Sequence, residues 1–216
     1  MQTKSLTLHY NPISTYSQKA LIALYEKGTE FKPAIVNVQD PAAQAAYREV
    51  YPLGKIPLLV VGEGHLIPES SIIIEYLDEN VDGPRLIPTD PELARRARFL
   101  TSFADNYVND TFRTIFFDGR KPEAAREPQR VAAAVEAQQT VLRFLEGQLR
   151  EGPWLLGETF SMADCALVPP LAYMAKGGQL ENYPNLSGYV GRAVERPSVA
   201  RTQKEAEPFL AALLGG

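Results

Sequence analysis

The sequence predicts an α/β domain followed by an all-helical domain, and two observations indicate this division. Over the first 80 residues, short extended apolar segments alternate with helical apolar patterns. The segment "NVDGPRLIPTDP" at 80–91 is rich in turn-forming residues, and beyond it apolar residues recur almost entirely at helical spacing. We therefore expect one domain at 1–80, a linker at 81–91 and a second domain at 92–216.

The first domain is predicted to begin with a strand, a helix and a second strand. The alternating segment "SLTLHY" at 5–10 is typical of a strand, the apolar run 20–25 of a buried helix, and "EFKPAIVNV" at 30–38 of an extended segment. Within 56–67, "IPLLVV" and "HLI" flank a Gly-Glu-Gly turn and predict a hairpin. Ser70 then begins a further helix.

The second domain is predicted to contain only helices. Asp90 and Pro91 are a typical helix start, and apolar residues at 93, 97, 100, 104 and 108 make the helix they begin long and amphipathic. Another helix begins near Pro128, with apolar residues at 131, 135, 142, 145 and 149. We expect three more helices, at about 161–176, 185–195 and 200–213.

The composition narrows the class of protein. With 216 residues, 45% of them hydrophobic, the chain can bury a core of its own. A net charge of −4 provides no basic stripe for a nucleic acid. Cys165 has no second cysteine to pair with, which is typical of a cytoplasmic protein. No apolar run reaches the roughly 18 residues of a membrane span. His9 and His65 lack metal-like spacing, so we expect neither membrane nor metal.

Three motifs resemble the soluble glutathione transferase superfamily: "PLGKIPLL" at 52–59, "PESSIIIEYLDE" at 68–79 and "WLLGETFSMADCALVPPL" at 154–171. The resemblance covers nearly the whole chain. It implies a thioredoxin-like first domain and a helical second domain, the glutathione transferase fold. It also implies a serine-type, bacterial-like detoxification enzyme that is cytoplasmic and homodimeric. Such an enzyme joins the glutathione thiolate, its co-substrate, to a small apolar electrophile.

The resemblance implies which residues hold glutathione. Pro57 matches the cis proline of the family, and the backbone of Ile56 would pair with the cysteinyl part, while Lys55 would reach the glycyl carboxylate. Ser70 would hold the γ-glutamyl carboxylate, because a helix start attracts anions, and Glu69 would pair with the γ-glutamyl ammonium. Taken without the resemblance, Ser70 is a helix cap, and Glu69 and Lys55 are solvated surface charges.

Two residues compete for the activation of the thiol. Counted back from Lys19, Ser14 falls where serine-type members place the hydroxyl that donates to the sulfur, and it is our first choice. Tyr10 ends the first strand, as in tyrosine-type members, and is the alternative. Ser14 is also explained as a plain helix N-cap. A serine in this place cannot form a mixed disulfide, so we do not expect glutaredoxin-like activity.

Other residues divide between pocket and structure. Ser161 and Asp164 have capping-box spacing, and Cys165 lies inside the helix that they begin, so we assign all three to structure. Five residues are expected to line the electrophile pocket: Pro12, Ile13, Phe103, Tyr107 and Phe116. The three aromatic ones are equally well explained as core residues.

Two further functions stay open on the same fold. One is a non-enzymatic glutathione-fold protein that binds ligands or partners. The other is a specialised glutathione-dependent dehalogenase or isomerase. Tests on a panel of electrophiles, with and without glutathione, discriminate between these functions and general conjugation.

Overall fold

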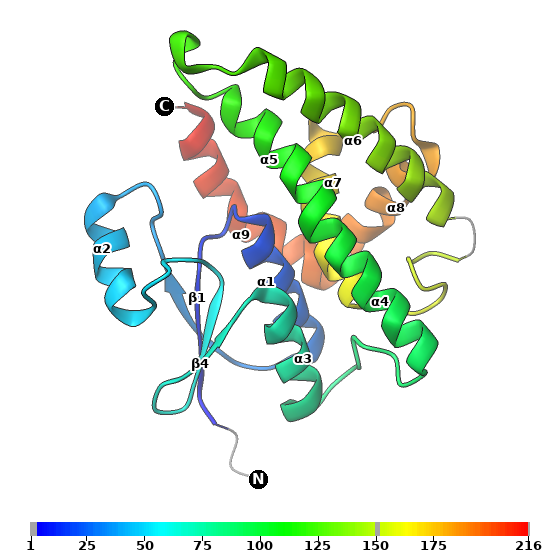
Figure 1. Ribbon diagram of the computed structural model, residues 1–216. Helices are drawn as coiled ribbons and strands as arrows, with labels where there is room; N and C mark the ends of the chain where they lie inside the picture. Colours follow the sequence, from blue (N-terminus) through cyan, green and yellow to red (C-terminus); the bar gives the residue numbers. More distant parts are fainter. Residues whose placement is uncertain (1–3, 150–151, 216) are drawn as a thin grey trace. The chain divides into compact units, whose positions relative to one another are not determined.

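The computed structural model describes residues 4–149 and 152–215, which fall into two compact units (Figure 1). The first unit comprises residues up to Ile87 together with the last helix, and the second unit runs from Pro88 to Arg196. No helix within the described residues combines the length and apolarity needed to cross a membrane.

A four-stranded sheet forms the centre of the first unit. Its spatial order is β2-β1-β3-β4, with β1 and β2 parallel and the other pairs antiparallel. The alternation predicted at the chain start is observed, because Leu6, Leu8 and Tyr10 are buried while the residues between them are partly exposed. The strands are β1 (Leu6–Tyr10), β2 (Lys32–Ile35), β3 (Leu58–Val61) and β4 (His65–Pro68).

One helix of the first unit was absent from the prediction. Helix α2 (Pro41–Val50) begins after the N-cap Asp40, whose side chain accepts the Ala42 N–H. Only Tyr47 of this helix is buried. The apolar residues at 43, 46, 47 and 50 nevertheless recur at helical spacing, a signal that the prediction did not use. The other helices, α1 (Thr15–Lys27) and α3 (Ser70–Asn80), lie where the apolar runs predicted them.

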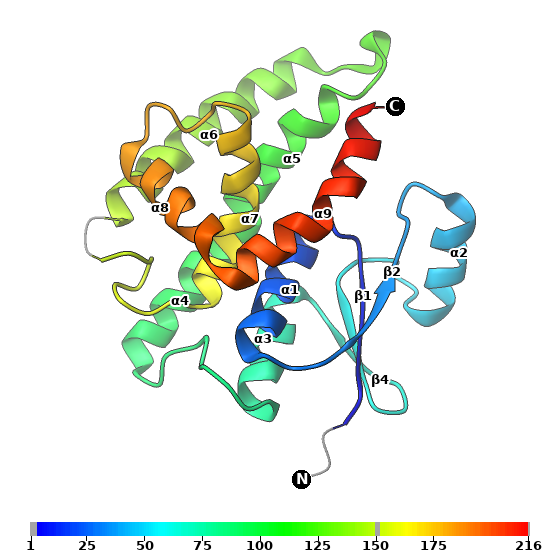
Figure 2. The same ribbon diagram turned by 180° about the vertical axis from the view of Figure 1, so that it is seen from behind.

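The last helix, α9 (Pro197–Gly215), belongs to the first unit because it packs along α1 (Figure 2). The Tyr25 hydroxyl donates to Glu205 Oε2 at 2.6 Å, and the Arg201 guanidinium lies 4.0 Å from the centre of the Tyr25 ring. The compact units therefore differ from the predicted division, which put all of 92–216 together. Whether the predicted domains fold independently stays a prediction.

The second unit is helical, as predicted, but its first long helix is interrupted. A π-helical turn, η1 (Ala104–Val108), separates α4 (Pro91–Phe103) from α5 (Asn109–Asp118). The remaining elements are η2 (Glu123–Ala125), α6 (Pro128–Gln148), α7 (Met162–Lys176) and α8 (Pro184–Glu195). Leu93 and Val135, which were predicted to lie on the apolar helix faces, are exposed.

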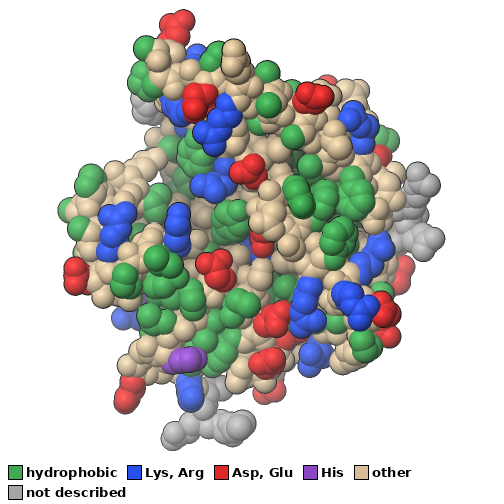
Figure 3. All heavy atoms as spheres, in the orientation of Figure 1, with side chains coloured by type: hydrophobic (Ala, Val, Ile, Leu, Met, Phe, Trp, Pro, Cys, Tyr) green, Lys and Arg blue, Asp and Glu red, His purple; other side chains and the backbone are tan. Residues whose placement is uncertain are grey.

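Aromatic side chains of α4, η1 and α6 gather at the surface of the second unit. We name Phe99, Phe103, Tyr107 and Phe144 the aromatic patch; the Phe103 and Phe144 ring centres lie 4.7 Å apart, and those of Phe103 and Tyr107 5.1 Å apart. Phe99 is 51% exposed and Tyr107 56%. Figure 3 shows apolar side chains gathered where Figure 1 places α4 and α6.

The start of α7 confirms the predicted structural role of the capping box. Ser161 and Asp164 each bond the other's backbone in the expected pattern. The fully buried Asp164 carboxylate also accepts the Leu155 N–H at 3.1 Å and the Tyr189 hydroxyl at 3.0 Å. Burial raises the pKa of Asp164, and these hydrogen bonds oppose the rise. Cys165 follows in the same helix and is fully buried.

Candidate functional site

The strand register brings three segments of the first unit to one end of the sheet. His9, near the end of β1, is paired with Leu58, where β3 begins, and Leu58 is paired with Pro68, where β4 ends. The residues that follow β1, precede β3 and follow β4 therefore emerge at the same end. These are the segments in which the sequence predicted Ser14, the Lys55–Pro57 stretch and the Glu69–Ser70 pair.

Ser14 is the N-cap of α1, and its side chain is half-buried. Its Oγ accepts the Ser17 N–H at 3.4 Å, and its own N–H donates to the Asn11 carbonyl at 3.1 Å. A hydroxyl that accepts one hydrogen bond still has its proton to donate. The capping role and a donor role toward an anionic sulfur are therefore compatible at this residue.

The turn before Ser14 is held by two buried amide side chains whose role the sequence did not indicate. Asn11 Nδ2 donates to the Val36 carbonyl at 3.0 Å, and Asn11 Oδ1 accepts the Ile13 N–H at 3.2 Å. Gln18 Nε2 donates to the Pro12 carbonyl at 2.8 Å. The signal that could have identified the turn is the Asn-Pro pair at its start. Pro12 is buried and Ile13 half-buried, so only Ile13 offers much surface to a ligand.

Tyr10, the alternative to Ser14, has a different environment. Its side chain is only 5% exposed and points into the core from β1. Burial, followed by the nearby carboxylate of Glu205, raises the pKa of the Tyr10 phenol, and the charge of Arg201 opposes the rise. Burial therefore favours Ser14 as the residue that meets a ligand, while the choice between the two stays a prediction.

The segment before β3 has the backbone form that the resemblance implies. The Ile56–Pro57 peptide bond is cis. Pro57 is buried, Ile56 is half-buried and the Lys55 side chain is exposed. The Lys55 carbonyl accepts a hydrogen bond from the Tyr47 hydroxyl at 2.8 Å. The cysteinyl and glycyl contacts assigned to Ile56 and Lys55 stay predictions.

The start of α3 combines backbone strain with an open helix end. Glu69 has φ 69° and ψ 122°, and it is the one non-glycine residue with positive φ in the described part of the chain. Such a conformation costs about 1–3 kcal/mol and is concentrated at functional sites. The side chain of the N-cap residue Glu69 makes no capping hydrogen bond, so the first N–H groups of α3 can receive an anion.

A buried lysine joins this helix start to α1. Lys19 is 1% exposed, and its Nζ donates to Ser71 Oγ at 2.6 Å. Ser71 follows Ser70, which is 4% exposed. The contact ties the helix that begins after Ser14 to the helix that begins after Glu69.

The aromatic residues predicted for the electrophile pocket belong to the second unit and form two separate clusters there. Phe103 and Tyr107 lie in the aromatic patch. Phe116 instead packs against Phe112, with ring centres 5.3 Å apart, and Phe112 stacks on Tyr173 at 5.7 Å. The structure therefore brings Phe103 and Tyr107 together but not with Phe116.

The two histidines occupy different surroundings. His9 stacks on the Tyr47 ring at 5.5 Å, and burial lowers the pKa of its imidazole. His65 is exposed at the start of β4. Across residues 4–149 and 152–215, no group of three His, Cys, Asp or Glu side chains is placed to hold a metal ion.

Comparisons with known proteins agree on one family. Residues 8–85 match the family model described as the glutathione S-transferase N-terminal domain, and residues 128–192 match the C-terminal domain model. A probable glutathione S-transferase of Nicotiana tabacum is 30% identical over 76% of this chain and 68% of its own length. A probable cytosolic glutathione S-transferase, DHAR1, of Oryza sativa is 27% identical over 91% of this chain and 86% of its own.

A solved structure is similar to almost the whole chain. The crystal structure of a glutathione S-transferase from Methylobacillus flagellatus, with GSH bound, has a TM-score of 0.83 and 29% identity. The alignment covers 92% of this chain and 98% of that one.

Proposed function

The chain belongs to the glutathione transferase superfamily, and from that premise we propose that it joins the glutathione sulfur to an electrophilic carbon of an apolar compound. One observation supports the proposal most. The start of α3, whose N-cap side chain makes no capping hydrogen bond, the backbone before Pro57 and the Ser14 hydroxyl emerge at the same end of one sheet. Glutathione offers a carboxylate, a peptide and a thiol to these three groups.

Each part of glutathione has an assigned partner in this proposal. The first N–H groups of α3 and the Ser70 hydroxyl hold the γ-glutamyl carboxylate, and the Glu69 carboxylate holds the ammonium. The backbone of Ile56 pairs with the cysteinyl part. Lys55, which is exposed, reaches the glycyl carboxylate. Ser14 donates to the sulfur.

The mechanism follows from the acidity of the thiol. A free cysteine-like thiol has a pKa near 8.5, so about 3% is thiolate at pH 7. A hydrogen bond to a charged acceptor contributes roughly 1.5–3 kcal/mol, which lowers the pKa by about one to two units and raises the thiolate to roughly 25–75%. The thiolate electron pair then forms the carbon–sulfur bond. The displaced pair departs with the leaving group or moves into an unsaturated acceptor, and the thiol proton passes to solvent.

Calorimetric titration with glutathione tests the site. Wild type should bind, and Glu69→Gln should bind about three- to tenfold more weakly, because an exposed ammonium contact is lost. Glu79→Gln is the matched control, since Glu79 is an exposed glutamate near the other end of the same helix. Equal affinity of wild type and Glu69→Gln would remove Glu69 from the site.

Turnover on a panel of apolar electrophiles tests the reaction. Acceleration that requires glutathione supports conjugation. Glutathione binding without acceleration of any electrophile would instead favour the ligand-binding alternative. Release of halide, or rearrangement without a stable conjugate, would identify the dehalogenase or isomerase alternative.

The aromatic patch supports a homodimer. Exposed clusters of large apolar side chains mark interaction surfaces. Phe99→Ser should shift the mass in light scattering toward the monomer, whereas Phe117→Ser should not, because Phe117 is 52% exposed but outside the patch. Phe103 and Tyr107 are also candidates for the electrophile pocket. Phe99 is not, so its replacement tests the dimer interface without changing a pocket residue. An unchanged dimer in the Phe99 variant would exclude the patch as the interface.

A cytoplasmic location fits the single cysteine and the rice relative described as cytosolic. Fractionation of expressing cells, followed by detection of the chain, measures its location. Recovery with the membrane or secreted fraction would contradict this part of the proposal.

A further inference from the structure

Helix α2 builds the loop that leads into β3. The Tyr51 N–H donates to the Tyr47 carbonyl at 2.9 Å, and the Gly54 N–H donates to the Tyr51 carbonyl at 2.8 Å. Gly54 has φ 60°, and a Cβ there would lie 3.1 Å from Arg48 Nε. The path of the loop that carries Lys55 is therefore set by the last turn of α2.

The Tyr47 hydroxyl makes the connection closest to the site. It donates to the Lys55 carbonyl at 2.8 Å from a side chain that is 6% exposed. Burial raises the pKa of the phenol, so the hydroxyl keeps its proton and stays a donor. The ring stacks on His9 of β1 and packs in one cluster with Val36 and Leu58. The donor is thus held by the sheet itself.

The geometry of a peptide unit carries this restraint to Ile56. The Lys55 carbonyl and the Ile56 N–H belong to one planar trans unit, in which they point in opposite directions. A hydrogen bond that holds the Lys55 oxygen toward Tyr47 therefore directs the Ile56 N–H away from α2. Ile56 is the residue whose backbone would pair with the cysteinyl part of glutathione.

We propose that Tyr47 is a positioning residue for the cysteinyl-glycyl half of the glutathione site. This inference rests on the proposed function. Tyr47 does not touch the ligand; it orients the Lys55–Ile56 peptide and limits the positions open to the Lys55 side chain. Without its hydroxyl, the peptide must be ordered when glutathione binds, which weakens affinity.

Tyr47→Phe tests the inference, because it removes one oxygen and keeps the ring on His9. We expect the Kd and KM for glutathione to rise about three- to tenfold, the loss of one neutral hydrogen bond, while kcat stays within about twofold. Tyr51→Phe is the matched control: it removes a hydroxyl from the same cluster but leaves the Lys55 contact, and we expect Kd within about twofold of wild type.

A folding check comes first. Circular dichroism and thermal melting without glutathione establish that each variant is folded at the assay temperature. If wild type gives no binding heat with glutathione, the proposed function fails and this inference fails with it. If wild type binds and Glu69→Gln binds more weakly, but Tyr47→Phe binds like wild type, the proposed function stands and Tyr47 has only a packing role. A loss of kcat with unchanged KM would also overturn the inference.

Discussion

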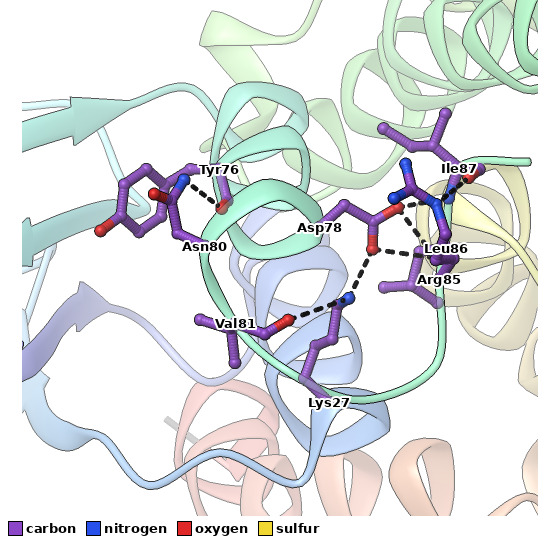
Figure 4. A network of polar contacts seen from close by, with 8 residues as sticks. All are labelled: Lys27, Tyr76, Asp78, Asn80, Val81, Arg85, Leu86 and Ile87. Atoms are coloured by element: carbon purple, nitrogen blue, oxygen red, sulfur yellow. Dashed lines mark hydrogen bonds and ion pairs between the residues drawn. The ribbon is translucent and has the colours of Figure 1, made fainter. Parts of the chain in front are cut away.

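Removal of either partner of the buried ion pair between Lys27 and Asp78 should strongly destabilise the first unit (Figure 4). Lys27 Nζ lies 2.7 Å from Asp78 Oδ1, and each side chain is 1% exposed. The carboxylate also accepts the backbone N–H groups of Leu86 and Ile87, the latter at 2.7 Å. One charge pair thus joins the end of α1, helix α3 and the segment that ends the first unit.

The magnitude follows from this burial. Removing one partner of a buried pair leaves an uncompensated charge and typically costs about 3–5 kcal/mol. The cost of Lys27→Met should lie near the lower end of this range, about 3 kcal/mol, because Asp78 keeps two backbone donors. Asp78→Ala should cost about 4–5 kcal/mol, because it also leaves the Leu86 and Ile87 N–H groups without their acceptor.

The two changes should not add. In the double variant Lys27→Met with Asp78→Ala, neither charge remains, so the loss should be close to that of Asp78→Ala alone and well below the sum. The coupling energy of the pair is the sum of the two single-variant losses minus the loss in the double variant. Replacement of both charges is not expected to restore wild-type stability, since Leu86 and Ile87 still lack their acceptor.

Urea denaturation, followed by circular dichroism and by tryptophan fluorescence, measures the loss of stability. Circular dichroism reports on both units, and the one tryptophan, Trp154, belongs to the second unit. The Lys27 variant should lower the midpoint seen by circular dichroism. Lys204→Met, at an exposed position of α9, is the matched control and should leave the midpoint unchanged. A Lys27→Met loss below about 1 kcal/mol, or additive losses in the double variant, would refute the reasoning.

Four further predictions concern the site and its supports. Ser14→Ala should lower turnover about tenfold near neutral pH and raise the apparent kinetic pKa, because the thiolate loses its donor. Tyr10→Phe should change both quantities much less. If Ser14→Ala changed neither quantity and Tyr10→Phe raised the kinetic pKa, the enzyme would be tyrosine-type. Cys165→Ala should leave conjugation rates unchanged, and a folded but inactive variant would contradict the core assignment. Glu69→Gly should weaken glutathione binding yet raise the free energy of unfolding by up to about 1 kcal/mol, since release of strain outweighs the entropy of glycine; chemical denaturation that shows a loss would mean that φ 69° is not strained. Asp164→Ala should cost about 3–5 kcal/mol in the same assay because its buried donors lose their acceptor, and a loss under about 1 kcal/mol would argue against the network.

The sequence by itself determined the elements whose signals are local. The alternation at 5–10, the Asp90–Pro91 helix start and the Ser161–Asp164 capping box each depend on neighbours a few residues away, and each was predicted correctly. The motifs around Pro57 and Glu69 likewise indicated the family from the order of a few adjacent residues.

Tertiary structure decided what depends on distant partners. Helix α2 buries only Tyr47, so its role becomes visible only in the contact with Lys55. Helix α9 joins the first unit through contacts with Tyr25, 180 residues away in the chain. The positive φ of Glu69, between the end of β4 and the start of α3, is a conformation that the local propensity of glutamate does not predict. Local patterns specify which elements form, whereas packing across long sequence separations specifies where they lie and which polar groups meet.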